Sequence, residues 1–178
     1  MQVLNKPQAL AALERAKANL GLRPGDCVMC AVYDRARSDR VLENAEGVVV
    51  LDRFGSRHGH LLVIAKAHLE SAVELGWERY AALQRLAYEA TLALEAAFNP
   101  ARVFVAALGS SEPIATSYPH YHIHVVPIAR HDDDARPARV FSWSAGIVQY
   151  DEAESRELVS KLKQAHRDRV TQAQQVVP

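Results

Sequence analysis

HYHIHVV, residues 120–126, alternates histidine with Tyr, Ile and Val from residue 120 to residue 125. In an extended strand successive side chains point to opposite faces, so residues two apart share a face. We therefore expect His120, His122 and His124 on one face, separated by steps of about 7 Å. The intervening Tyr121, Ile123 and Val125 are expected on the other face, packed against a core.

Three imidazoles on one strand face need an explanation other than burial, because each buried ring requires a hydrogen-bond partner. One explanation is a metal site, since neutral imidazole is a common ligand for zinc and iron. The other is nucleophilic catalysis, in which one histidine attacks phosphorus and its neighbours orient it. The preceding loop, residues 109–119, carries several hydroxyls and one glutamate, a composition that suits a phosphate better than a hard cation.

Five segments of the sequence are rich in branched apolar residues and are bounded by glycine or polar residues, which predicts strands. They are residues 39–44, 47–53, 60–66, 102–108 and 121–128. The first three follow one another closely and predict an antiparallel meander. A helix is predicted over residues 77–98, where apolar residues repeat at threes and fours until Asn99-Pro100 ends the pattern.

The two ends of the chain carry further predicted elements. Residues 7–20 have a helical apolar stripe that Gly21 ends. Asp151 and Glu154 form a capping box for a helix over residues 152–167. Residues 141–150 suggest a pair of short strands, in which Trp143 and Tyr150 are expected to fill a hydrophobic corner. The fold class is therefore α+β: an antiparallel sheet of about five strands, a long helix across one face, and N- and C-terminal helices.

The chain has 178 residues, of which 49% are hydrophobic and 24% charged, and this composition fits a compact globular protein. Its 21 basic residues balance 21 acidic ones, whereas a protein that binds duplex nucleic acid normally carries excess positive charge. No apolar run is long enough for a membrane span, and the charged, helix-periodic start does not resemble a signal peptide. We therefore expect a cytoplasmic protein that binds a small molecule, with no duplex nucleic-acid or membrane partner.

Cys27-Val28-Met29-Cys30 is the other conspicuous motif. In a chain without an export signal, Cys-x-x-Cys indicates metal binding or redox chemistry rather than a structural disulfide. A redox motif of this type requires a helix N-terminus after a strand, and the residues after Cys30 do not clearly offer one. Zinc is therefore favoured, and two further ligands are needed to close a four-coordinate site.

Three motifs in order resemble the histidine triad superfamily. HYHIHVV is similar to its His-φ-His-φ-His-φ-φ signature, in which φ is apolar. Residues 59–68, GHLLVIAKAH, resemble the family's strand leading into Pro-Lys-x-His, with Ala65 in place of the proline. Cys27 and Cys30 stand where zinc-bearing members have Cys-x-x-Cys. The resemblance covers residues 27 to 130 and implies three segments: a helical extension (1–25), a triad-type catalytic domain (26–130), and a C-terminal extension with short strands and a helix (131–178).

The resemblance also implies roles for individual residues. The middle histidine, His122, is the nucleophile that forms a nucleotidyl-histidine on the α-phosphorus of a nucleotide. His124 stabilises charge on the phosphate oxygens, and His60 lies near the phosphate or the leaving group. Ser117 hydrogen-bonds there, and Asp52 binds the ribose hydroxyls.

In zinc-bearing relatives, the ligands that join the two cysteines resemble His68 and the first triad histidine, His120. The implied zinc is structural, with Cys27, Cys30, His68 and His120 as a closed set, so no catalytic metal is expected. The family further implies a homodimer whose sheets join.

The sequence departs from the family in the loop before the triad, which usually reads with an Asn and then Gly-Gln-Ser/Thr. Because these side-chain amides are missing, the sequence does not indicate which leaving group the protein releases. The function that the sequence predicts is hydrolysis at the α-phosphate of a nucleoside phosphoramidate or a dinucleoside polyphosphate. Hydrolysis is favoured because no second substrate site is apparent. The alternatives are a nucleotidyltransferase or phosphorylase, a nucleotide-binding module without turnover, and a metalloenzyme whose triad holds a catalytic metal.

Overall fold

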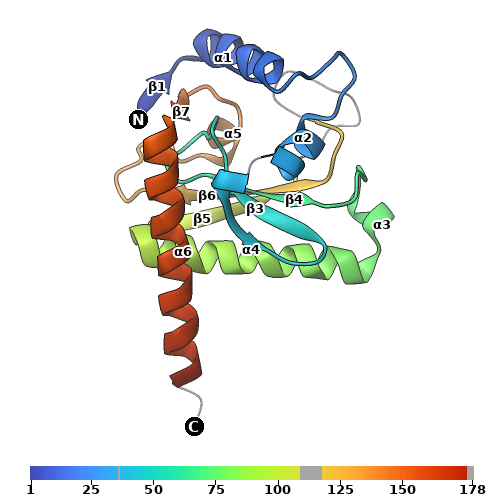
Figure 1. The fold of residues 1–178 in the computed structure, drawn as a ribbon. Coiled ribbons are helices and arrows are strands. Elements are labelled where there is room, and N and C mark those ends of the chain that lie inside the picture. Colours follow the sequence, from blue (N-terminus) through green and yellow to red (C-terminus); the bar gives the residue numbers. More distant parts are fainter. Residues whose placement is uncertain (36, 109–117, 176–178) are drawn as a thin grey trace.

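The computed structural model describes residues 1–35, 37–108 and 118–175. A five-stranded antiparallel sheet lies at its centre, with strand order β2-β3-β4-β6-β5 (Figure 1). The strands are β2 (Arg40–Glu43), β3 (Gly47–Leu51), β4 (Leu61–Ala65), β5 (Arg102–Ala106) and β6 (His122–Ile128). All five strands predicted from the sequence are present, the first three form the predicted meander, and the α+β class is confirmed.

The long helix α4 (Trp77–Phe98) has the predicted limits. It ends because Asn99 adopts a left-handed conformation, with φ 45°, and Pro100 cannot continue the hydrogen-bond pattern. This helix runs along one face of the sheet, below it in Figure 1. Alternate residues of the strands bury their side chains against it, including Val49, Val63, Ile123 and Val125. Tyr121, Ile123 and Val125 thus pack against a core, as the alternation predicts.

The N-terminal helices α1 and α2 lie over the opposite face of the sheet (Figure 1). Helix α2 (Val28–Arg35) packs there through Met29 against Val48, Val50, Leu62 and Ile64. Helix α1 (Lys6–Asn19) lies farther out and begins at a capping box in which Asn5 and Gln8 exchange side-chain and backbone hydrogen bonds. The sheet register pairs Leu62 with His124 and Ile64 with His122, so both histidines lie on this face.

The N-terminus and a strand of the C-terminal extension form a second, two-stranded sheet. Strand β1 (Gln2–Leu4) pairs antiparallel with β7 (Ile147–Gln149). The predicted strand pair within residues 141–150 is therefore wrong: β7 is its only strand, and its partner is the N-terminus. Residues 141–145 form turns instead, and both Trp143 and Gly146 have positive φ, a conformation that breaks a strand.

Shorter helices complete the fold: a 3-10 turn (Arg37–Asp39), α3 (Ala72–Leu75) and α5 (Pro137–Val140). The final helix, α6 (Glu152–Gln175), crosses the edge of the sheet and packs against α4. It begins where the capping box predicts but continues beyond residue 167. None of the helices in the described ranges is long and apolar enough to cross a bilayer.

Candidate active site and metal cluster

A cavity of about 790 Å³ lies between helices α1 and α2 and the sheet face that carries His122 and His124. Its polar floor contains Asp52 at the end of β3, His60 before β4, and His122 and His124 on β6. Its apolar wall includes Leu13 and Leu20 from the α1 region, Met29 from α2, and Phe141 and Trp143 from the C-terminal extension. A cavity of this size accommodates a nucleotide-sized ligand.

His122 has a fixed tautomer. Its side chain is 3% exposed, and its Nδ1 lies 2.6 Å from the carbonyl oxygen of His120. Because a carbonyl oxygen only accepts, Nδ1 carries the hydrogen and Nε2 keeps its lone pair. Burial is the main cause that lowers the pKa of His122, which favours the neutral ring. The residue therefore presents a buried, neutral imidazole on the floor of the cavity, with Nε2 unprotonated.

His60 and His124 form a directed hydrogen-bond chain beside His122. The backbone N–H of Ser56 donates to His60 Nδ1 at 3.1 Å, so the His60 hydrogen is on Nε2. That Nε2–H donates to His124 Nδ1 at 3.0 Å, which leaves the His124 hydrogen on Nε2. Burial lowers the pKa of His60 to about 3 and that of His124 well below its usual value, so both rings are neutral at pH 7. The chain ends in an N–H donor on His124, beside an edge contact with Phe141 at 5.8 Å between ring centroids.

Asp52 is the carboxylate of the cavity floor. Its Oδ1 accepts the Phe54 N–H at 2.8 Å, and its Oδ2 lies 3.4 Å from His60 Nδ1. Burial raises the pKa of this carboxyl to about 6, and only the Phe54 hydrogen bond and the nearby His122 ring oppose the rise. An aspartate held with so little compensation is typical of a functional position.

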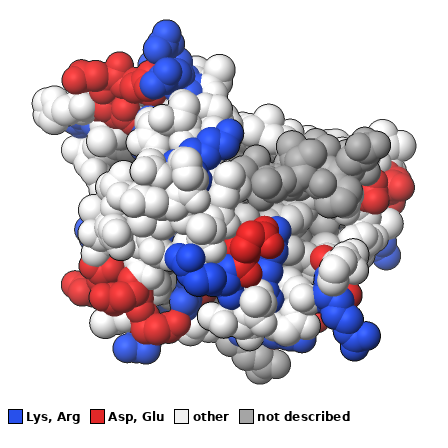
Figure 2. All heavy atoms as spheres, turned by 90° about the horizontal axis from the view of Figure 1, so that it is seen from above, with Lys and Arg blue, Asp and Glu red and all other residues white. Residues whose placement is uncertain are grey.

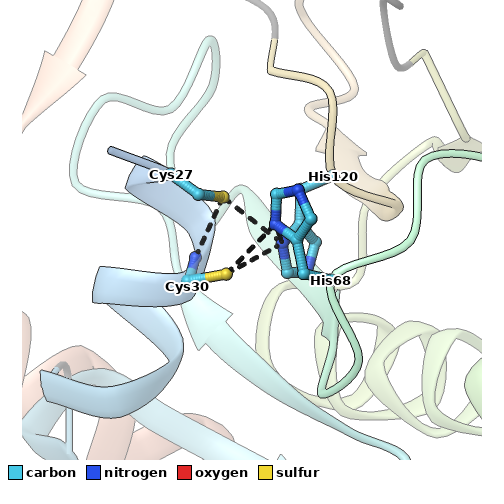
Figure 3. A group of neighbouring side chains, drawn as sticks. All are labelled: Cys27, Cys30, His68 and His120. Carbon is cyan, nitrogen blue, oxygen red and sulfur yellow. Dashed lines mark hydrogen bonds between the residues drawn. The ribbon is translucent and has the colours of Figure 1, made fainter. Parts of the chain in front are cut away.

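A second cluster lies at the N-terminal end of α2, where Cys27, Cys30, His68 and His120 converge (Figure 3). Their ligand atoms all lie within 4.8 Å of one another, and four of the pairwise distances are 3.3 to 3.4 Å. Ligands in a tetrahedral zinc site are separated by about 3.3 to 3.8 Å, given bonds of about 2.0 Å to nitrogen and 2.3 Å to sulfur. His120 Nε2 lies 2.9 Å from the carbonyl oxygen of Ala65, so its hydrogen is there and Nδ1 faces the thiols. The donor set and its supporting hydrogen bond thus fit zinc.

The two thiols of this cluster differ. Burial by itself would raise the pKa of Cys27, but hydrogen bonds with His120 and the Cys30 amide lower it to about 6. Burial and the neighbouring Cys27 raise the pKa of Cys30 to about 12. The expectation that no helix follows the cysteines is wrong, because α2 begins at Val28. The segment before Cys27 is irregular rather than a strand, however, and the two histidines beside the thiols favour a metal over redox chemistry.

The structure separates the site residues predicted from the sequence into these two groups. His60, His122, His124 and Asp52 line the cavity. The four predicted metal ligands form the second cluster. His120 lies before β6 rather than on it, so the predicted row of three histidines on one strand face is reduced to two. Ser117 lies outside the described residues.

Some residues that shape the site were missed. The Ser56 amide sets the tautomer of His60, but a backbone donor carries no signal in residue type. Tyr150 packs in the hydrophobic core as expected, but its hydroxyl also accepts the Gly59 N–H, which the sequence did not indicate. The cavity wall from α1 depends on the pairing of β1 with β7, which joins segments far apart in sequence.

The sequence was compared with protein-family models and with known proteins. Residues 26–135 match the family model described as "Scavenger mRNA decapping enzyme C-term binding". A HIT-like protein of 16.1 kDa from Mycoplasma pneumoniae is 33% identical over 104 residues, which cover 57% of this chain and 71% of that protein. The chain belongs to the histidine triad family. Within this family the sequence resembles the zinc-bearing members that have Cys-x-x-Cys. The family predicted from the sequence is therefore confirmed.

Solved structures of histidine triad proteins share the fold. A Zn-bound histidine triad protein from Mycobacterium smegmatis superposes with a TM-score of 0.63 at 22% identity, over 82% of this chain and 96% of that one. A histidine triad nucleotide-binding protein from Sulfolobus tokodaii gives 0.63 at 20% identity, over 80% and 93%. A uridylyltransferase gives 0.63 at 18% identity, over 89% of this chain and 51% of that one. At these identities the likeness shows that the chain shares the fold of these proteins.

Seen from above (Figure 2), acidic and basic side chains form small mixed groups, and the described part of this face has no broad area of one sign. Arg53, which lines the cavity, is already paired with Asp39 and Glu152. Such a face does not offer the continuous positive surface that duplex nucleic acid requires.

Proposed function

We propose that this protein hydrolyses nucleotide conjugates at the α-phosphate through a nucleotidyl-histidine on His122. The observation that carries the proposal is the 2.6 Å contact of His122 Nδ1 with the His120 carbonyl oxygen. It leaves Nε2 as a neutral nucleophile in a cavity of nucleotide size. In the first step Nε2 bonds to phosphorus, and the leaving group departs with the electron pair of its own bond to phosphorus. In the second step water attacks phosphorus and loses a proton to solvent, the P–N bond returns its electron pair to Nε2, and the leaving group, which left as an anion, takes one proton from solvent.

The directed chain from Ser56 through His60 supports a role for His124. Its Nε2–H would donate to a phosphate oxygen, where charge grows as the nucleophile approaches. Because both rings are neutral, the donor stabilises the phosphate without adding a proton that the leaving group could take. The buried hydroxyl of Ser56 also lines the cavity and has no hydrogen-bond partner within the described part of the chain. A phosphate oxygen bound there would supply one.

We assign the ribose to Asp52, because each carboxylate oxygen can accept a further hydrogen bond and the residue lines the cavity. Ser117 keeps its proposed contact with the phosphate on the family resemblance alone. The Cys27, Cys30, His68 and His120 set would hold zinc, which supplies a rigid link between α2 and the triad loop and no chemistry on the substrate. We also expect the homodimer to form through β5, an edge strand on which Val105 is 46% exposed.

Other functions are less well supported. A catalytic metal on the triad conflicts with the hydrogen bonds, because His60 and His124 bind each other and His122 Nδ1 binds a carbonyl. A transferase would use the same first step and replace water by a second acceptor. A binding module without turnover would retain the cavity but show no reaction.

The test is AMP release from adenosine phosphoramidate and diadenosine tetraphosphate by purified protein. We expect turnover by the wild type, and a loss of at least about 1,000-fold in the His122→Ala variant, because that variant has no nucleophile. The matched control is His131→Ala, which removes an exposed histidine and should leave turnover unchanged. Tight AMP binding without release by the wild type would show a binding module. AMP release that persists in His122→Ala would refute the mechanism.

A further inference from the structure

The loop that joins β3 to β4, residues 53–59, sets the direction of the His60–His124 hydrogen-bond chain. Two groups compete for His60 Nδ1. The Ser56 N–H lies 3.1 Å from this nitrogen and can donate to it only if the nitrogen carries no hydrogen (a bare nitrogen). Asp52 Oδ2 lies 3.4 Å from the same nitrogen and, when ionised, favours a hydrogen on it. Which of them prevails depends on where the loop holds the Ser56 amide.

The two outcomes differ at the cavity. With Ser56 as donor, His60 donates from Nε2 and His124 is left with an N–H for the phosphate. If Asp52 took the hydrogen on Nδ1, His60 Nε2 would become an acceptor. His124 would then have to donate from Nδ1, and its Nε2 would present a lone pair to the phosphate instead of a hydrogen. The reversed chain would repel the charge that the forward chain stabilises.

The loop is held from outside by the C-terminal extension. The buried Gly59 N–H donates to the Tyr150 hydroxyl at 2.9 Å, and Val148 N–H donates to the Gly55 carbonyl at 2.8 Å. The Tyr150 hydroxyl in turn lies 3.1 Å from His58 Nδ1. Gly59 has φ +82°, and a Cβ there would approach the Phe98 ring to 2.7 Å. Position 59 therefore requires glycine, and the loop is tightly packed there.

We propose that Tyr150 is a positioning residue: its hydrogen bond to Gly59, together with the Val148–Gly55 hydrogen bond at the other end of the loop, holds the Ser56 amide on His60 Nδ1 and thereby makes His124 a hydrogen donor toward the cavity. Tyr150 is 6% exposed and lies beyond residues 26–135, which match the family model. The device therefore belongs to the extension of this chain rather than to the matched region. Its catalytic consequence rests on the proposed function, but the tautomer itself does not.

The test is the Tyr150→Phe variant, which keeps the buried ring and removes only the hydroxyl. Long-range ¹H–¹⁵N spectra of the histidine rings distinguish a bare nitrogen from an N–H. In the wild type we expect His60 with a bare Nδ1 and His124 with an Nε2–H. In Tyr150→Phe we expect a hydrogen on His60 Nδ1. If His124 donates to phosphate, kcat falls by at least about 100-fold, as when this donor is removed outright, while KM changes less than about twofold, because the lost donor acts on developing charge.

Three further variants separate positioning from packing. His58→Ala removes the other partner of the Tyr150 hydroxyl and should keep the wild-type tautomer. Tyr88→Phe removes an exposed hydroxyl and should change neither spectrum nor rate. Asp52→Ala combined with Tyr150→Phe removes the competing acceptor and should restore a bare His60 Nδ1.

A bare His60 Nδ1 in folded Tyr150→Phe, or an equal change in His58→Ala, would overturn the proposal. The spectra need no substrate. A tautomer that changes as expected in a protein without turnover would therefore sustain the positioning role while refuting the proposed hydrolysis.

Discussion

His120 and His122 are two residues apart, yet they present opposite nitrogens to opposite partners. His120 donates its Nε2–H to the carbonyl of Ala65, and its Nδ1 faces the thiols of Cys27 and Cys30. His122 donates its Nδ1–H to the carbonyl of His120, so its unprotonated Nε2 is available to the cavity. The side chains are identical, so the difference lies in which nitrogen a backbone carbonyl takes. The metal cluster and the cavity floor are thus distinguished by backbone acceptors.

This comparison predicts that the two clusters can be lost separately. We expect the Cys27→Ser variant to lose bound zinc, because three ligands without the low-pKa thiol hold the ion far more weakly. The His122→Ala variant should retain it, because His122 offers no atom to the metal cluster. Metal analysis of both purified variants gives the ratio of zinc to protein. Zinc lost from His122→Ala and kept by Cys27→Ser would reverse the assignment of ligands.

The donor on His124 is the next largest expected effect. In His124→Ala we expect kcat to fall by about 100-fold, the usual effect of removing one donor from a charge-stabilising site. His124→Gln keeps an N–H on a side chain of similar reach, so it should recover part of this loss. Steady-state kinetics on adenosine phosphoramidate separate kcat from KM. Equal rates in the two variants would show that His124 contributes packing rather than a hydrogen bond.

Asp52 gives an effect on stability rather than on turnover, and that effect depends on pH. Its pKa is raised from 3.8 to about 6, so the folded protein binds this proton more tightly than the unfolded chain, and ionisation of the buried carboxyl destabilises the fold as pH rises through that window. Asp52→Asn removes this penalty. At pH 7.5 the variant should be more stable than the wild type by up to about 3 kcal/mol, and the gap should narrow to less than about 1 kcal/mol at pH 4.

Urea unfolding at the two pH values measures the difference. Asp133→Asn is the control, since it replaces an exposed aspartate. A gap for Asp52→Asn that is the same at both pH values would show that the carboxyl is not held at a cost. In that case Asp52 would not be a strained functional residue.

Local patterns explain why most of the fold could be predicted from the sequence. Period-two alternation predicted β6, and the Asn99-Pro100 stop predicted the end of α4 at Phe98. The β1–β7 pair could not be predicted, because strands of three residues have almost no period and their pairing is long-range. Helix α2 was missed because it has only eight residues and begins directly at the metal motif.

The site was predictable where residue type carries the chemistry. Imidazole, carboxylate and thiol side chains indicate catalysis or metal binding by their chemistry. The structure brings those of the site histidines, Asp52 and the two cysteines into two clusters. The tautomers were not predictable in this way. They depend on the carbonyls of Ala65 and His120 and on the amide of Ser56, and every residue type except proline has both groups.

The most direct test of the central claim is to trap the covalent intermediate. Wild-type protein mixed with adenosine phosphoramidate is denatured within one turnover in alkali, in which a phosphorus–nitrogen bond to histidine survives, and its peptides are analysed by mass spectrometry. The account predicts an adenylyl group on the peptide that contains HYHIHVV, located at His122 by fragmentation and removed by acid. An adenylyl group on any other residue, or AMP release at full rate with no adduct, would contradict it.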